Sequence, residues 1–144
     1  MITQCAIICS PSEVFVMEIW VKIGRTKKKY QGSFRAVMES IVKDGKGKET
    51  VQLLSFHAGK KERRRLKREL REHDKDLLKT ASAIARWFYE IDRRKIRRRI
   101  KELKKRARYL SKGEIFYRPK VMEQVRELEK QLEEIDRKIE ELKV

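Results

Sequence analysis

The chain has 144 residues, of which 39 are Lys or Arg and 22 are Asp or Glu, and its formal net charge is +17. An apolar share of 40% is enough to build a core, so the composition excludes a disordered basic tail. No stretch approaches about 18 uncharged apolar residues, and we therefore expect no membrane-spanning segment.

The chain contains no Asn, while Lys, Arg and Glu are abundant. Few thermolabile amides combined with many charges are typical of hyperthermophile proteins, which predicts a thermophilic, prokaryotic source. The first residues lack a basic region and their apolar run is short, so we expect no secretory signal and a cytoplasmic location.

Residues 1–58 are rich in β-forming residues and carry a net charge of +4. Their patterning predicts a strand over 2–9, a turn over 10–13, a strand over 14–23 and a loop over 24–32. Because the strand over 14–23 has apolar residues on both faces, we expect it to be central in a sheet.

Both cysteines, Cys5 and Cys9, fall in the first predicted strand. Four residues along a strand separate them by about 13 Å, which is too far for a disulfide between them. No second Cys or His pair follows at zinc-site spacing, so we expect buried structural thiols and no metal site.

Residues 33–44 have apolar side chains at helical spacing, with Ser33 suited to an N-cap and Gly45 to the C′ position. We favour a helix, and a strand is the alternative. A strand over 49–56 follows. The head formed by residues 1–58 is then β-β-α-β, or a β-meander if 33–44 is a strand.

Residues 60–110 contain no Gly or Pro, and apolar residues recur at helical spacing. The pattern predicts one long helix over about 60–110. Its register shifts between Ile91 and Ile96, which predicts a possible bend near Asp92.

A connector over 111–119 precedes a second helix over about 119–143, whose apolar positions follow a heptad pattern. The short connector requires the two helices to be antiparallel. We therefore predict an α+β protein with two parts, a head of residues 1–58 and a long helical hairpin of residues 59–144.

Two long helices packed together bury only the apolar side that each turns toward the other. The apolar residues of 66–91 therefore need a further surface to cover them. We therefore expect a homo-oligomer, with a dimer favoured.

The strongest functional signal is the sequence RRKIRRRIKELKKRAR over residues 93–108, which has eleven basic residues and one acidic residue, Glu102. With Ile96 at zero and about 100° per residue, the apolar positions lie within about 40° of Ile96 and the basic ones fill the rest. Phosphates would relieve the repulsion among them. The alternative is a solvated basic surface, partly neutralised by acidic residues of the last helix.

A second basic cluster opens the long helix at residues 60–71. If the strand over 49–56 runs parallel to the strand over 14–23, the loop over 24–29 lies at the same end of the head as this helix start. We therefore predict one joint basic patch there. The candidate nucleic-acid-binding residues of both regions are Arg25, Lys27, Lys28, Lys29, Lys60, Lys61, Arg64, Arg65, Arg68, Arg94, Arg97, Arg98, Lys101, Lys104, Lys105 and Arg108.

Aromatic residues are secondary candidates. Trp87 lies within the predicted helix, where packing is the favoured role, and Phe116 and Tyr117 in the connector are better placed to contact a ligand.

No phosphate-binding loop, dinucleotide-binding motif or metalloprotease motif is present, and the chain has only two histidines. We therefore expect a non-enzymatic protein without cofactors that binds DNA or RNA largely independently of sequence. The alternative is an assembly or adaptor protein whose hairpin binds another protein. Docking of the basic helix on anionic lipid is a weaker third possibility, because the apolar stripe lacks an interfacial Trp.

Overall fold

A computed structural model describes residues 17–48, 50–109 and 118–144 of the chain. The protein has a mixed α+β fold, as predicted. The residues group into two compact units, Met1–Ala85 with Leu142–Val144, and Arg86–Glu141. The predicted division between residues 1–58 and 59–144 falls at Gly59, the N-cap of a helix, and its role as a domain boundary stays a prediction.

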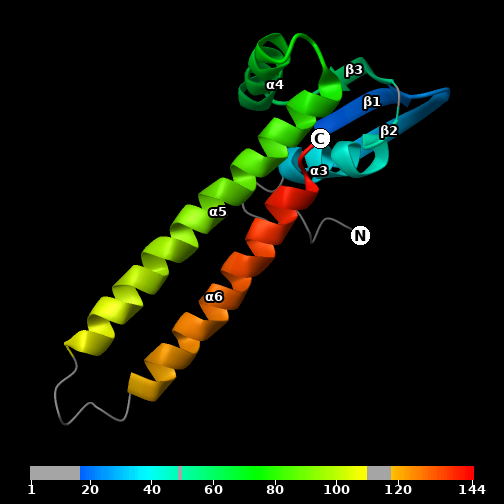
Figure 1. Cartoon of the computed structure of the whole chain (residues 1–144). Helices are drawn as coiled ribbons and strands as arrows, with labels where there is room; N and C mark the ends of the chain where they lie inside the picture. The colour runs from blue at the N-terminus through cyan, green and yellow to red at the C-terminus, as the bar shows by residue number, and fades with distance from the viewer. Residues whose placement is uncertain (1–16, 49, 110–117) are drawn as a thin grey trace, which may run out of the picture. The chain divides into compact units, whose positions relative to one another are not determined.

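The first unit contains an antiparallel sheet of β1 (Met17–Ile23), β2 (Thr26–Gly32) and β3 (Val51–His57), in the order β2-β1-β3 among the described residues (Figure 1). β1 is therefore central, as predicted. Burial alternates along it, so Met17, Ile19, Val21 and Ile23 are covered while Trp20 on the opposite face is 39% exposed. The apolar residue Trp20 on the second face of this strand is thus partly exposed, although the strand is central.

The predicted loop over 24–32 is instead strand β2. A two-residue connection joins it to β1, with Ile23 paired to Thr26 and Gly24 at a φ of +62°. Glycine at the first position of such a connection suits a type II′ hairpin turn. The lysine-rich composition has low β-propensity and hid the strand, although lysine is a common residue on sheet edges, where it discourages pairing with other chains.

Residues 33–44 form a helix, α3 (Phe34–Gly45), which confirms the favoured prediction and excludes the β-meander. The Oγ of Ser33 accepts a hydrogen bond from the Ala36 N–H at 3.2 Å, so Ser33 is the N-cap, as expected. The helix lies against β1 and β2 and buries four of its apolar side chains: Val37, Met38, Ile41 and Val42.

Gly45 is not the C′ residue that the sequence predicted. It is the last residue of α3 and is buried, and a Cβ there would lie 3.0 Å from Cγ2 of Val51 and 3.1 Å from Cδ1 of Leu78. The absence of a side chain at this position lets α3 approach its neighbours closely.

β3 runs antiparallel to β1, with Val51 opposite Ile23 and His57 opposite Glu18. The predicted parallel direction is wrong, because the additional strand β2 introduces one more reversal of the chain.

The predicted single helix over 60–110 is two helices, α4 (Lys60–Glu72) and α5 (Leu77–Arg108). The N–H of Lys75 donates to the Leu70 carbonyl at 2.7 Å and Asp74 has a φ of +54°, which together form a Schellman motif. Asp76 then caps α5, its Oδ1 accepting from the Lys79 N–H at 3.1 Å. The interruption thus lies at 73–76, and α5 continues without a break through Asp92.

In the second unit, α5 and α6 (Arg118–Glu141) form the predicted antiparallel hairpin (Figure 1). Arg93 on α5 forms an ion pair with Asp136 on α6 at 3.1 Å, and Arg118 donates to the Ala107 carbonyl at 3.1 Å. The early part of one helix therefore lies beside the late part of the other. The buried core of the hairpin consists of Ile100, Leu103, Ala107, Val121 and Val125.

Several predictions fall outside the described residues: the strand over 2–9 with Cys5 and Cys9, the turn over 10–13, residues 14–16 of the strand over 14–23, the connector with Phe116 and Tyr117, and the end of the helix at 110. In the part of the chain that the structure describes, no helix has the length and apolar character needed to cross a bilayer.

Candidate nucleic-acid interface

The second half of α5 has one buried side, and that side is the predicted apolar stripe. Ile100, Leu103 and Ala107 are 9%, 3% and 6% exposed and belong to the core shared with α6, and Ile96 is half-buried beside them. This burial pattern orients α5 so that the remaining directions around the helix face away from the hairpin core.

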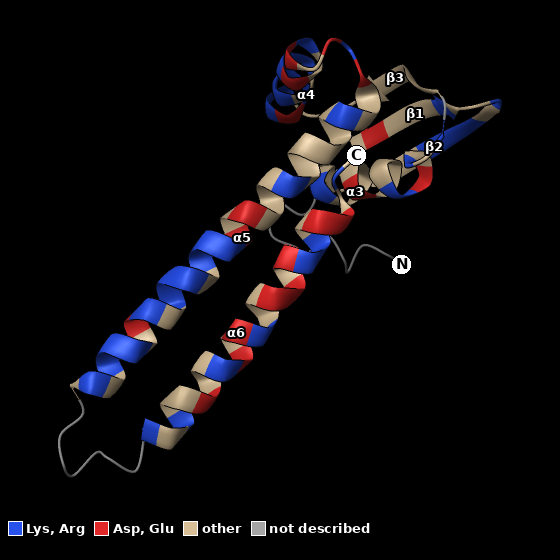
Figure 2. Ribbon diagram, viewed as in Figure 1, with Lys and Arg blue, Asp and Glu red and all other residues tan. Residues whose placement is uncertain are grey.

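Basic residues make up most of the rest of this segment, and the second half of α5 is mainly blue in Figure 2. With Ile96 at zero and about 100° per residue, they extend from about 80° at Lys104 to about 300° at Arg99, interrupted only by Glu102. All of these side chains are exposed. The set, called here the α5 arc, consists of Arg94, Lys95, Arg97, Arg98, Arg99, Lys101, Lys104, Lys105, Arg106 and Arg108.

The acidic residues of α6 do little to neutralise the α5 arc. Asp136 pairs with Arg93, which is half-buried and lies outside the arc, and Glu134 pairs with Arg137 within α6 itself. Among the described residues, the one ion pair formed by an arc residue joins Arg99 to Glu102 at 3.8 Å. Neutralisation by ion pairs across the hairpin, the alternative considered from the sequence, thus involves Arg93 and, among the described residues, no member of the α5 arc.

Part of the positive charge also has a local structural role. Lys105, Arg106 and Arg108 lie in the last turn of α5, where cations interact favourably with the negative end of the helix dipole. The Arg118 guanidinium donates to the Ala107 carbonyl in the same turn. These interactions concern one turn only and do not explain the arc over the preceding turns.

The candidates on β2 are partly engaged within the head. Lys28 lies 3.0 Å from Oδ2 of Asp44, and Lys29 lies 3.3 Å from Oε1 of Glu18. Arg25 and Lys27 are exposed, and no ion pair involves them among the described residues. The four predicted residues are all exposed, and they divide into two with carboxylate partners and two with none among the described residues.

The joint basic patch predicted from β2 and the start of α4 is wrong. α4 begins three residues after His57, which pairs with Glu18 at the end of the sheet remote from the turn at Gly24 and Arg25. α4 therefore starts at this remote end. Along it, Lys60, Lys61, Arg64 and Arg68 are exposed, whereas Arg65 is half-buried and pairs with Glu69 at 3.4 Å.

A different set of cations lies toward the turn end of the sheet. Lys67, Arg71 and Lys75 line a cavity of about 670 Å³ together with the first residues of β3, and Val51 of β3 pairs with Ile23 beside the turn. The sequence prediction missed these residues because it placed β3 in the wrong direction.

An exposed aromatic residue was also missed. Trp20 on the uncovered face of β1 has the Lys29 Nζ 5.8 Å from its ring centroid, a cation–π contact. The strict alternation of buried residues in 17–23 would have identified this face, which Glu18 and Lys22 share. Trp87, for which the sequence favours a packing role, contacts Phe88 edge to face with ring centroids 4.9 Å apart and is 36% exposed.

Within the described ranges, no group of three or more His, Cys, Asp or Glu side chains is arranged to hold a metal ion. The described part of the chain therefore offers charged helical surfaces rather than a coordination site.

The fold and these surfaces define the chain as an α+β protein with a strongly basic helical hairpin. It is 68% identical over 128 residues to a protein of Aquifex aeolicus (strain VF5) described as "Uncharacterized protein", an alignment that covers 89% of this chain and all of the relative. The chain therefore belongs to the same family as that protein. No protein-family model matches it, and no solved structure does.

Proposed function

We propose that this protein is a non-enzymatic nucleic-acid-binding protein that contacts phosphates through the α5 arc, largely independently of sequence. The observation that carries the proposal is the density of unneutralised charge, ten exposed cations on one helical segment with one ion pair among the described residues.

The physical argument is electrostatic. Like charges at neighbouring helical positions repel one another, and pairing at i,i+4 does not relieve the repulsion here because Glu102 is the single acidic residue of the segment. A nucleic acid would relieve it and would gain free energy by releasing condensed counterions. Contacts to phosphates position a protein without reading bases, which is why we propose little sequence preference.

The other candidates have a secondary place in this proposal. Arg25 and Lys27 at the turn, and Lys60, Lys61, Arg64 and Arg68 at the start of α4, are exposed cations on separate parts of the first unit. Lys28, Lys29 and Arg65 have carboxylate partners, so we assign them a structural role first.

The test is a titration of a labelled nucleic acid with the full chain over a series of salt concentrations. The charge-reversal variant Arg97→Glu, Arg98→Glu and Lys101→Glu should weaken binding to all sequences alike and flatten the salt dependence. The matched control reverses three exposed cations of α6: Lys120→Glu, Arg126→Glu and Lys130→Glu.

The proposal predicts a steep fall of affinity with salt for the wild-type chain, and a larger loss for the α5 variant than for the control. Affinity that does not change between low and moderate salt contradicts it. Equal losses for the two variants would mean that net charge, and not the α5 arc, determines binding.

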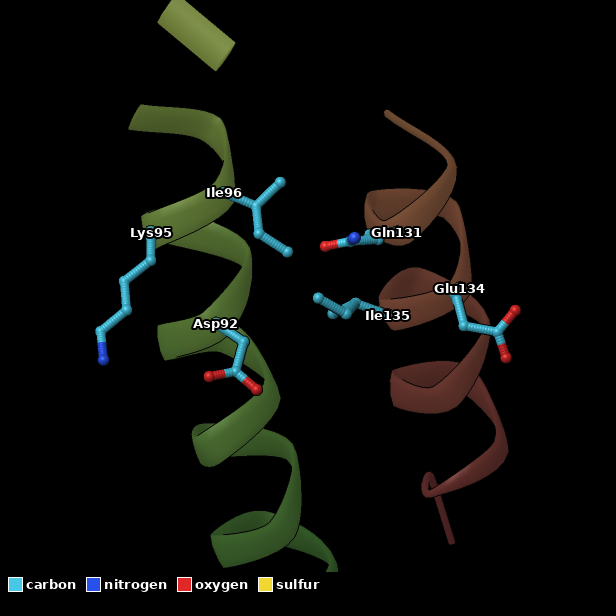
Figure 3. Close-up of a pocket in the computed structure, with 6 residues that line it drawn as sticks. All are labelled: Asp92, Lys95, Ile96, Gln131, Glu134 and Ile135. Carbon is cyan, nitrogen blue, oxygen red and sulfur yellow. The ribbon is translucent and has the colours of Figure 1, made fainter. Parts of the chain in front are cut away.

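A second candidate function is assembly, and one observation favours it. Within the second unit, an apolar cavity of about 440 Å³ lies between α5 and α6, with Ile96 and Ile135 facing it and Asp92, Lys95, Gln131 and Glu134 around it (Figure 3). The occupant that we propose for it is a second copy of this chain, because Lys95 on α5 and Glu134 on α6 are complementary charges that a two-fold axis would bring together.

Sedimentation analysis tests the assembly candidate. Lys95→Glu should weaken a dimer, and the double variant Lys95→Glu with Glu134→Lys should restore it. A monomer at all concentrations, or a dimer insensitive to both variants, would exclude this interface.

A further inference from the structure

We infer that the nucleic acid bound by the α5 arc is duplex DNA, and that the second half of α5 enters its major groove. This inference rests on the proposed function and makes it more specific, because it names the ligand class and the mode of docking. Three properties of the helix lead to it: the angular width of the arc, its linear charge density and its diameter.

The first property is the angular width of the arc. A helix that lies on a single row of phosphates needs a stripe of cations on one side only. The α5 arc instead spans about 220° around the helix axis, so cations such as Lys104 and Arg99 point about 140° apart, toward two different sides of the helix. Anions on two opposite sides of a helix are what the two walls of a groove provide.

The second property is the linear charge density. Residues 94–108 carry ten basic residues and one acidic residue, a net charge of +9. At about 1.5 Å per residue they span about 21 Å, which is roughly one net positive charge per 2.3 Å. Duplex DNA carries one negative charge per about 1.7 Å of axis, whereas one of its strands carries one per about 3.4 Å. The helix is thus closer in charge density to a duplex than to a single strand.

The third property is shape. An α-helix with its side chains is about 10–12 Å across, and the major groove of B-DNA is about 12 Å wide. The side of α5 that would face out of the groove is the side that packs against α6 through Ile100, Leu103 and Ala107. The deep, narrow major groove of A-form RNA does not admit a helix, so the same argument selects DNA over double-stranded RNA.

The first experiment compares three probes of the same random sequence and of roughly two helical turns: duplex DNA, duplex RNA and single-stranded DNA. Binding of the full chain is measured at several salt concentrations. We expect duplex DNA to bind at least about tenfold more tightly than duplex RNA, because the RNA groove excludes the helix. We also expect a steeper salt slope for duplex than for single-stranded DNA.

The outcomes separate this inference from the proposed function. Tight, salt-dependent binding of all three probes with equal affinity overturns groove insertion and leaves phosphate binding intact. Preference for the single strand or for duplex RNA also overturns it. Failure to bind any probe overturns both.

The second experiment tests whether both sides of α5 contact the nucleic acid. One variant removes charge from the side near 100° (Arg97→Gln, Lys101→Gln, Lys104→Gln), and the other removes it from the side near 280° (Lys95→Gln, Arg99→Gln, Arg106→Gln). Glutamine has a helix propensity close to that of the residues it replaces, and circular dichroism checks that α5 is retained. The matched control is Lys120→Gln, Arg126→Gln and Lys130→Gln on α6.

Groove insertion predicts that both α5 variants lose affinity for duplex DNA comparably, each with a salt slope lowered by about three units if all three contacts are to phosphates. The α6 control should change much less. A loss confined to one side would show that the helix lies across the backbone and not in the groove, and it would overturn the inference.

Discussion

The hydroxyl of Tyr30 donates a hydrogen bond to Oδ2 of Asp44 at 2.7 Å and so joins β2 to the last turn of α3. The Lys28 Nζ lies 3.0 Å from the same oxygen. The hydrogen bond from Tyr30, followed by that from Lys28, lowers the pKa of Asp44. Burial, and then the carboxylate itself, raises the pKa of Tyr30.

This arrangement makes the head sensitive to acid. Because the pKa of Asp44 is lower in the folded chain than its unfolded value of about 3.9, its stabilising contribution is present above the unfolded pKa. The contribution is lost as the pH falls through the folded pKa. Tyr30→Phe removes the largest cause of the lowered pKa, so the variant should lose less stability on acidification than the wild type.

Urea unfolding at neutral pH and at about pH 3 measures the effect, and the variant should be less stable by about 1 kcal/mol at neutral pH. Lys28→Gln is the matched control and should produce a change in the same direction but smaller. If the stabilities of wild type and Tyr30→Phe fell in parallel between the two pH values, the hydrogen bond would not be the cause.

Gly45 provides a test of the close packing of α3. Inside a helix, Ala is favoured over Gly by about 1 kcal/mol, but here its Cβ would press on side chains of Val51 and Leu78. Gly45→Ala should therefore gain less stability than propensity alone predicts, and Gly45→Leu should lose about 1–3 kcal/mol through overpacking. Thermal unfolding of the two variants measures this, and a Leu variant as stable as wild type would refute the packing role of the glycine.

Much of the fold could be predicted from the sequence because long periodic segments bury one face. The apolar positions of 33–44 and 119–143 set the buried sides of α3 and α6 directly. β2 could not be predicted in the same way, since the Thr-Lys-Lys-Lys run has no apolar alternation and becomes a strand through the turn at Gly24 and its pairing with β1.

Of the two predicted basic regions, the sequence predicted the α5 arc correctly and the joint patch of β2 and α4 incorrectly. The α5 arc depends only on helical periodicity, which the sequence carries locally. Whether β2 and the start of α4 lie at the same end of the sheet depends on the direction of β3. That direction is a non-local property, and one missed strand reverses it. Lys28 and Lys29 likewise looked like surface charge in the sequence, because their partners Asp44 and Glu18 are brought close only by the fold.

The core of the hairpin should depend on a few residues. Leu103 is 3% exposed and lies among the buried residues shared by α5 and α6, whereas Leu128 is half-buried at the edge of this core. Leu103→Ala should cost about 2–5 kcal/mol, and Leu128→Ala should cost clearly less, because truncation costs scale with the cavity left behind. Urea unfolding monitored by helical circular dichroism measures both, and equal costs would contradict the assignment of Leu103 to the core centre.

Two substitutions in the connection between α4 and α5 should change the stability of the protein in opposite directions. Asp74 has a φ of +54° at the C′ position, where Gly is the usual residue, so Asp74→Gly should raise the stability by about 0.5–1 kcal/mol. Asp76 accepts the N–H of Lys79 as the N-cap of α5, so Asp76→Ala should lower the stability by about 1 kcal/mol. Both replacements remove one negative charge, which makes each the electrostatic control of the other. Changes of the same sign in thermal unfolding would mean that charge, and not the backbone and cap geometry, determines where the two helices separate.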